Sequence, residues 1–174
     1  ARKTLLHIGD ILCKIYLTVI RGTPVVVQLM IMFYIIFATS RNGVGVAMLA
    51  FGVNSGAYVA ELIRGGIMAI DKGQLEAGRS LGFDYVQTMR FIIVPQALKT
   101  ILPALGNEFV TVIKESSIVS VIGIADLMFR TNDVIALSYK SLECLAVAAL
   151  IYFVLTFISS RIVSLAERKL SHGK

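Results

Sequence analysis

Long apolar runs separated by short polar segments define the pattern of this chain. A membrane-spanning helix needs roughly 20 apolar residues at about 1.5 Å each. The runs that reach or approach this length lie at residues 24–39, 44–63, 101–124 and 145–162. Residues 17–20 could extend the first run across the interruption at residues 21–23, and Pro24 suits the first turn of a helix. The pattern predicts an all-α polytopic integral membrane protein with about four visible transmembrane helices.

The third run is more polar than the others. It contains Asn107, Glu108, Lys114 and Glu115. Charged side chains are costly within hydrocarbon and usually face other protein or water. We therefore expect this helix to line a water-filled path or to pack against other helices.

The composition agrees with a membrane protein. Hydrophobic residues make up 56% of the chain and charged residues 16%, with a mean hydropathy of +0.79. A soluble domain carries about 25% charged residues. These values exclude a disordered tail, a coiled coil and a disulfide scaffold. The net charge of +6 would suit nucleic acid, but so high a hydropathy argues against it.

Basic residues are unevenly distributed between the polar segments. Most of the 17 Lys and Arg residues lie before the first run, in the long block 64–100, or after the last run. The two other loops hold only Arg41, Arg130 and Lys140. Because cytoplasmic loops collect Lys and Arg, the three basic segments are expected on the cytoplasmic side. We interpret residues 1–174 as a single transmembrane domain with a cytoplasmic loop at 64–100.

The cytoplasmic block carries a spaced motif. Glu76-Ala77-Gly78 is followed by three residues and Gly82, and then by nine residues and Ile92-Ile93-Val94-Pro95. We expect residues 76–81 to form a short amphipathic helix, with Gly73, Gly78 and Gly82 permitting tight bends. Such a helix is a suitable docking element for a partner. The alternative is a connector that only spaces two membrane helices.

This motif resembles the EAA loop of ABC importer permeases, which reads Glu-Ala-Ala, three residues, Gly, nine residues and Ile-x-Leu-Pro. Gly78 stands in place of Ala and Val94 in place of Leu, and both changes are small or apolar. The resemblance implies that this loop couples the permease to an ATPase. The residues implied for coupling are Glu76, Ala77, Gly78, Arg79, Ser80, Leu81, Gly82 and Pro95.

Other segments resemble the branch of this family that carries polar amino acids and opines. They are Arg21-Gly22-Thr23-Pro24 with Gln28, residues 54–61 and 64–66, residues 103–108 and 114–117, and residues 167–170. The branch normally has five transmembrane helices, with one more before the position of residue 1. The resemblance implies a bacterial cytoplasmic-membrane importer that works by alternating access. Its expected cargo is a glutamine-like or basic amino acid.

The chain itself is not expected to be an enzyme. It contains no GxxxxGK[ST] phosphate loop, so a partner ATPase dimer would bind ATP and Mg²⁺. No hydrolase motif or metal-ligand spacing occurs, and Cys13 and Cys144 are interpreted as structural. The resemblance further implies a second permease subunit, identical or related, and an extracytoplasmic solute-binding protein. Membrane lipid and the amino acid complete the expected partners.

Polar residues within the runs follow helical spacing. Asn54, Tyr58 and Glu61 share one face of a helix, and Lys114 lies on a similar stripe in the third run. A free amino acid carries an ammonium and a carboxylate, and both need polar partners on the way across hydrocarbon. Candidate substrate-pathway residues are Asn54, Ser55, Tyr58, Glu61, Glu108, Lys114, Glu115 and Ser116.

Structural roles remain open for the same residues. Glu61 could pair with Arg64, Lys114 could pair with a neighbouring carboxylate or a helix end, and Asn54 and Ser55 could join helices. Three other functions also remain open. The first is an ABC permease for another small polar solute such as an opine. The second is a secondary transporter or channel without ATP, and the third is a membrane-anchored assembly protein that binds no solute.

Overall fold

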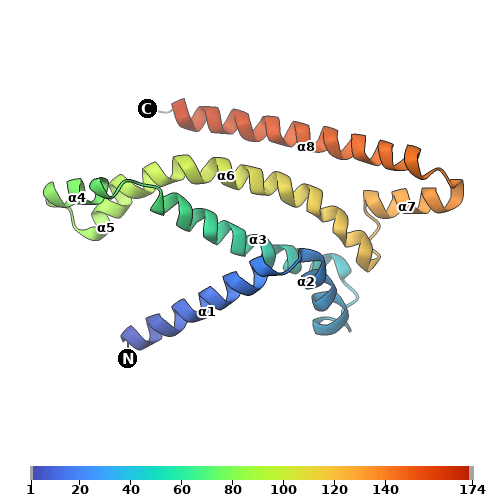
Figure 1. Ribbon diagram of the computed structural model, residues 1–174, viewed down its shortest axis with the longest axis horizontal. Helices are drawn as coiled ribbons and strands as arrows, with labels where there is room; N and C mark the ends of the chain where they lie inside the picture. Colours follow the sequence, from blue (N-terminus) through green and yellow to red (C-terminus); the bar gives the residue numbers. More distant parts are fainter. Residues whose placement is uncertain (1, 173–174) are drawn as a thin grey trace. The chain divides into compact units, whose positions relative to one another are not determined.

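The computed structural model describes the backbone of residues 2–172 and the side chains of residues 7–168. Every regular element in this part of the chain is helical, which confirms the all-α prediction (Figure 1). The elements are α1 (Arg2–Gly22), α2 (Val25–Ile31), the π-turn η1 (Met32–Ile36), α3 (Gly43–Met68), α4 (Lys72–Ser80), α5 (Tyr85–Thr88), the π-turn η2 (Met89–Ile93), α6 (Val94–Glu115), the 3₁₀ segment η3 (Ser116–Ile122), α7 (Leu127–Ser138) and α8 (Ser141–His172).

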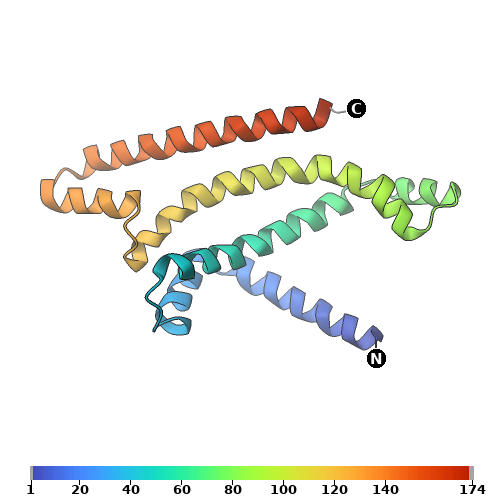
Figure 2. The ribbon, with the colours of Figure 1, turned by 180° about the vertical axis from the view of Figure 1, so that it is seen from behind.

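Two described helices are long and apolar enough to cross a membrane. They are α3 and the portion Ser141–Arg168 of α8, which match the predicted runs 44–63 and 145–162. A third span results if His7–Gly22 and Val25–Ile36, which meet at 108°, form one broken span. Helix α6 is not among them, in keeping with its polar residues. Figure 2 shows α3, α6 and α8 as long continuous helices from the opposite side.

The segment before Pro24 is a long helix that was not predicted from the sequence. Pro24 lies in extended conformation (φ −64°, ψ 137°), and its carbonyl accepts hydrogen bonds from the amides of Val27 and Gln28. The lack of an N–H on Pro24 is harmless at this position. The first predicted run is therefore helical only from Val25 to Ile36, where the π-turn ends.

The chain folds as two compact units. The first contains Ala1–Tyr58 and Val112–Leu155, and its core is Leu29, Ala47, Ala50 and Ile122. The small side chains of Ala47 and Ala50 allow α3 to pack closely against Leu29 of α2 and against η3. Helix α2, helix α3 and the segment η3 are thus joined by apolar packing.

The second unit contains Val59–Thr111 and Thr156–Lys174. It depends on glycines where helices approach closely. A Cβ atom at Gly66 of α3 would overlap the side chain of Ile101 on α6, and one at Gly106 of α6 would overlap Val163 on α8. Small residues allow this close approach, which is common between membrane helices.

Candidate coupling loop and transport pathway

Helix α4 contains most of the predicted coupling motif. It begins at Lys72 because the Asp71 carboxylate caps it, accepting the Gly73 amide at 2.6 Å. The predicted helix at residues 76–81 is thus present but begins earlier and ends at Ser80. Its end is a Schellman turn: the Gly82 amide donates to Arg79 O at 2.9 Å and the Phe83 amide to Gly78 O at 3.1 Å.

The glycines of the motif have different roles. Gly82 has φ +83°, a left-handed conformation that other residues adopt at a cost, so the predicted bend is confirmed there. Gly78 instead lies inside α4, and a Cβ atom on it would be 2.5 Å from Cγ2 of the fully buried Thr88. The bends predicted at Gly73 and Gly78 are wrong, because both residues lie within the helix and Gly78 serves close packing.

Polar contacts order the start of helix α5 and join α4 to α6. Asp84 and Gln87 form a capping box, with the Gln87 amide donating to the Asp84 carboxylate at 2.7 Å. The Thr88 hydroxyl donates to Asp84 O at 2.8 Å. Gln96 on α6 donates to the Gln74 side chain of α4 at 3.2 Å. The loop is therefore a structured hairpin rather than a slack connector.

The α4–α5 hairpin and the start of α6 present the predicted coupling residues at the surface. Glu76, Ala77, Arg79, Ser80, Leu81, Gly82 and Pro95 are exposed, and only Gly78 is buried. Apolar side chains surround them, with Leu81 72% and Val86 69% exposed. We call this surface the coupling knob. A partner could bury its apolar side chains, which is the usual meaning of such a patch.

The chain continues from the coupling knob directly into α6. The π-turn η2 (Met89–Ile93) joins α5 to α6 without a loop, and Pro95 is the second residue of α6. Proline has no backbone N–H to donate within a helix, and the π-turn lies where that hydrogen bond would otherwise be made. The coupling knob and α6, which carries Glu108 and Lys114, are therefore joined without an intervening loop.

The corner between α1 and α2 is held by a polar cluster in the first unit. The Gln28 amide nitrogen donates to Ile20 O at 2.8 Å and to the Thr23 hydroxyl at 2.8 Å. These bonds occupy groups that the end of α1 leaves without helical partners. The buried Asn54 donates from α3 to Gln28 Oε1 at 3.0 Å. Asn54 therefore fixes α3 to the corner.

Two further contacts join α1 to α3. The Tyr16 hydroxyl donates to Val53 O at 2.5 Å, and the Arg21 guanidinium lies 5.7 Å from the centre of the Tyr58 ring. Neither Gln28 nor Tyr16 was among the candidate site residues, although Gln28 was noted in the family resemblance. The sequence feature that could have indicated a role for Gln28 is its position four residues after Pro24, where the helix is broken. The joining role considered for Asn54 is present in the structure, and its pathway role stays a prediction.

The Asn54–Gln28 bond should contribute measurably to stability. We expect Asn54→Leu and Gln28→Leu each to lower the free energy of unfolding by about 1–2 kcal/mol, because either change removes a bond between helices. The double variant should lose little more than the worse single variant. Thermal unfolding in detergent measures all three. Fully additive losses would mean that the two side chains act independently.

The remaining pathway candidates lie in different surroundings. Glu61 is partly buried and accepts a hydrogen bond from the Arg64 Nε at 2.9 Å, which matches the structural alternative. Glu108 and Ser55 are also partly buried. Lys114 is exposed and forms no ion pair with Glu115 in the part of the chain that the structure describes.

Ser116 lines a cavity in the first unit. The cavity has a volume of about 400 Å³ and is otherwise mostly apolar, with Val44, Met48, Phe51 and Val112 among its walls. It lies between the start of α3 and the junction of α6 with η3. Such a volume is in the range of small-molecule sites. A pathway role for Ser116 remains a prediction.

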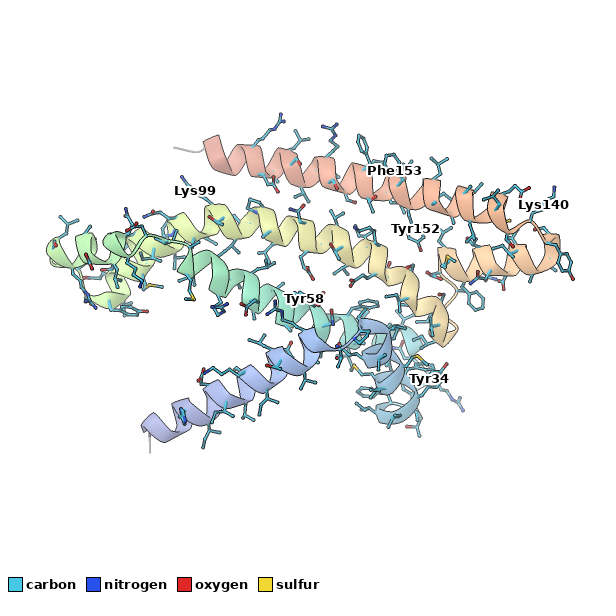
Figure 3. All side chains as sticks on the ribbon, viewed as in Figure 1. Tyr34, Tyr58, Lys99, Lys140, Tyr152 and Phe153 are labelled. Carbon is cyan, nitrogen blue, oxygen red and sulfur yellow. The ribbon has the colours of Figure 1, made fainter. Side chains whose placement is uncertain are left out.

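A second polar cluster was not predicted. The Asp126 carboxylate caps α7 by accepting the Phe129 amide at 2.8 Å, and its other oxygen is buried. Tyr152 on α8 interacts with this carboxylate and with Ser117. Figure 3 shows Tyr152 and Phe153 on opposite sides of α8. Only folding brings these residues together, since they are distant in sequence.

Nothing in the described residues forms a metal centre. No group of three His, Cys, Asp or Glu side chains there could hold an ion. Cys13 and Cys144 are free thiols.

Comparison with known proteins assigns the family. Residues 7–172 match the model of the binding-protein-dependent transport system inner membrane component. The chain is 46% identical over 158 residues to an arginine transport system permease protein of Bacillus subtilis, covering 89% of this chain and 72% of that protein. It is 36% identical over 167 residues to a glutamine transport system permease protein of Escherichia coli, covering 94% and 76%.

A solved structure agrees. A crystal structure of an amino acid ABC transporter with histidines superimposes with a TM-score of 0.82 at 47% identity, covering 90% of this chain and 74% of that one. The long helices and the match over nearly the whole chain define a membrane-embedded permease subunit of an ABC transport system. The chain belongs to the family of binding-protein-dependent transport system inner membrane components. The family resemblance seen in residues 76–95 is thereby confirmed.

Proposed function

We propose that this permease carries a polar amino acid, glutamine-like or basic, inward across the cytoplasmic membrane of a bacterium. The similarity to permeases named for arginine and glutamine transport carries this proposal. Alternating access would present a central site first to one side of the membrane and then to the other. An extracytoplasmic binding protein would deliver the amino acid.

The coupling knob is the proposed dock for an ATPase. Seven of its eight predicted residues are exposed, and the bonds from the Gly82 and Phe83 amides to carbonyls of α4 hold the end of that helix in place. A partner dimer would bind ATP and Mg²⁺ and would push the knob when it closes. Because α5, η2 and α6 follow one another without a loop, this push would reach the polar part of α6.

The complete machine needs two permease subunits around one path. The second subunit is an identical or a related chain. Asn54, Ser55, Tyr58, Glu61, Glu108, Lys114, Glu115 and Ser116 remain the candidates for contact with the cargo. Carboxylates among them suit an ammonium or guanidinium group, and Lys114 suits a carboxylate.

Uptake by the reconstituted complex tests this function. Vesicles that contain the permease, its copurifying ATPase and its binding protein should accumulate labelled arginine or glutamine only with ATP on the ATPase side, and vanadate should stop it. Glu76→Ala should leave the complex folded but lower uptake at least ten-fold relative to ATP hydrolysis. Asp10→Ala, an exposed change on α1, is the matched control.

The outcomes separate the alternatives. Uptake of an opine with no amino acid uptake would move the cargo to another small polar solute. Transport without ATP would instead favour a secondary transporter or channel. Binding of no solute by the complex would leave an assembly role.

A further inference from the structure

A groove lies between α7 and the first half of α8, within one compact unit. Its volume is about 420 Å³. Its walls come only from these two helices and the turn between them. The lining residues are Leu127, Arg130, Thr131, Val134, Ser138, Lys140, Glu143, Cys144, Val147, Ala148 and Ile151.

The walls of the groove are mainly apolar. Val134 of α7 lies opposite α8, which contributes Val147 and Ile151. Helix α8 is one of the two clear membrane spans, and neighbouring side chains such as Leu150 (61% exposed) and Phe153 (63% exposed) are open to the surroundings. The groove is thus continuous with the apolar surface of a helix that lies in lipid.

Charged side chains also line the groove. Lys140 lies in the turn between the helices (Figure 3), and its ammonium forms no ion pair in the described part of the chain. Arg130 pairs with Asp133 at 3.2 Å, but both side chains are largely exposed, so the pair is weak. Glu143 is the single acid in the lining. The cations outnumber the acid, and the amino end of α8 adds positive potential.

We propose that this groove binds an anionic membrane phospholipid. One acyl chain lies between Val134 and Ile151, and the phosphodiester lies beside Lys140 and Arg130. Apolar walls with cationic side chains match a lipid, since its apolar chain and its anionic group need different surroundings. A free amino acid fits poorly, because both of its charges would need partners along the apolar walls.

Lipid binding to the detergent-purified complex tests the proposal by native mass spectrometry. Added phosphatidylglycerol should form adducts at lower concentration than phosphatidylcholine. Arg130→Ala and Lys140→Ala should each weaken phosphatidylglycerol binding by about five-fold. Lys140→Arg should retain binding, and Arg41→Ala, an exposed basic residue outside the groove, should change nothing.

A second variant tests the apolar wall. Val147→Trp should fill the groove and abolish the phosphatidylglycerol adduct, while an unchanged unfolding temperature shows that the fold is intact. If that variant proves unfolded, Val147→Thr, which keeps the volume close but makes the wall polar, should weaken the adduct. Equal binding of both lipids, or full binding after loss of both cations, would overturn the proposal. So would displacement of the lipid by arginine, or a change from one oligomeric state to another in Val147→Trp.

Discussion

Gly78→Ala should lower the stability of the coupling knob and reduce ATP-driven uptake, although the EAA loop of related permeases has alanine at this place. The added Cβ atom would come within 2.5 Å of Thr88 Cγ2 and 2.8 Å of Thr88 Oγ1. Thr88 is fully buried and stiff at its branched Cβ, so it cannot move aside cheaply. Overpacking of this kind costs about 1–3 kcal/mol. Uptake and ATP hydrolysis by the same vesicles, with thermal unfolding, measure the effect.

A compensating change identifies the cause. Thr88→Ala removes both clashing atoms, so Gly78→Ala with Thr88→Ala should recover most of the lost coupling. Thr88→Ala alone should cost little more than its bond to Asp84 O. Gly65→Ala is the matched control, because a Cβ atom there meets nothing within 4 Å. Failure of the double variant to recover would show that Gly78 acts on the partner rather than on Thr88.

Gly66→Ala should destabilise the second unit strongly, whereas the same change at Gly65 should not. The Cβ atom at Gly66 would overlap the Ile101 side chain, which is itself only 4% exposed. We expect a loss of about 1–3 kcal/mol at Gly66. Gly65→Ala should be neutral or should stabilise by up to about 1 kcal/mol through helix propensity.

The unfolding temperatures of the Gly65→Ala and Gly66→Ala proteins in detergent test this difference. The two variants have the same composition and lie in the same helix, so a difference between them isolates the contact between α3 and α6. Equal unfolding temperatures would contradict the close approach at Gly66. Adding Ile101→Ala to Gly66→Ala should reduce the overlap, at the cost of lost packing.

Local rules made several elements predictable. The apolar runs at 44–63 and 145–162 became α3 and α8, because only a helix satisfies every backbone group in lipid. Pro24 marks the start of α2, since proline is best tolerated at the beginning of a helix. The motif from Glu76 to Gly82 corresponds to a helix that is ended by Gly82, whose backbone is in the left-handed conformation. Each of these features depends on residues close together in the chain.

Other features depend on partners far away in the chain. Helix α1 was missed because its apolar residues stop at the Arg21–Thr23 break, and its 108° corner is held by Asn54 of α3. The need for glycine at position 78 is visible only once Thr88 packs against it. The cluster of Ser117, Asp126 and Tyr152 likewise requires α8 to return to η3.

The amino-acid sequence by itself determined the family, the helical class, the main spans and the position of the coupling motif, because these follow from hydrophobicity and short-range spacing. The tertiary structure alone decided which polar residues join helices, where glycine is required for contact, and where a groove opens between α7 and α8. These depend on distances between residues that the chain separates by ten or more positions, and such distances exist only after packing.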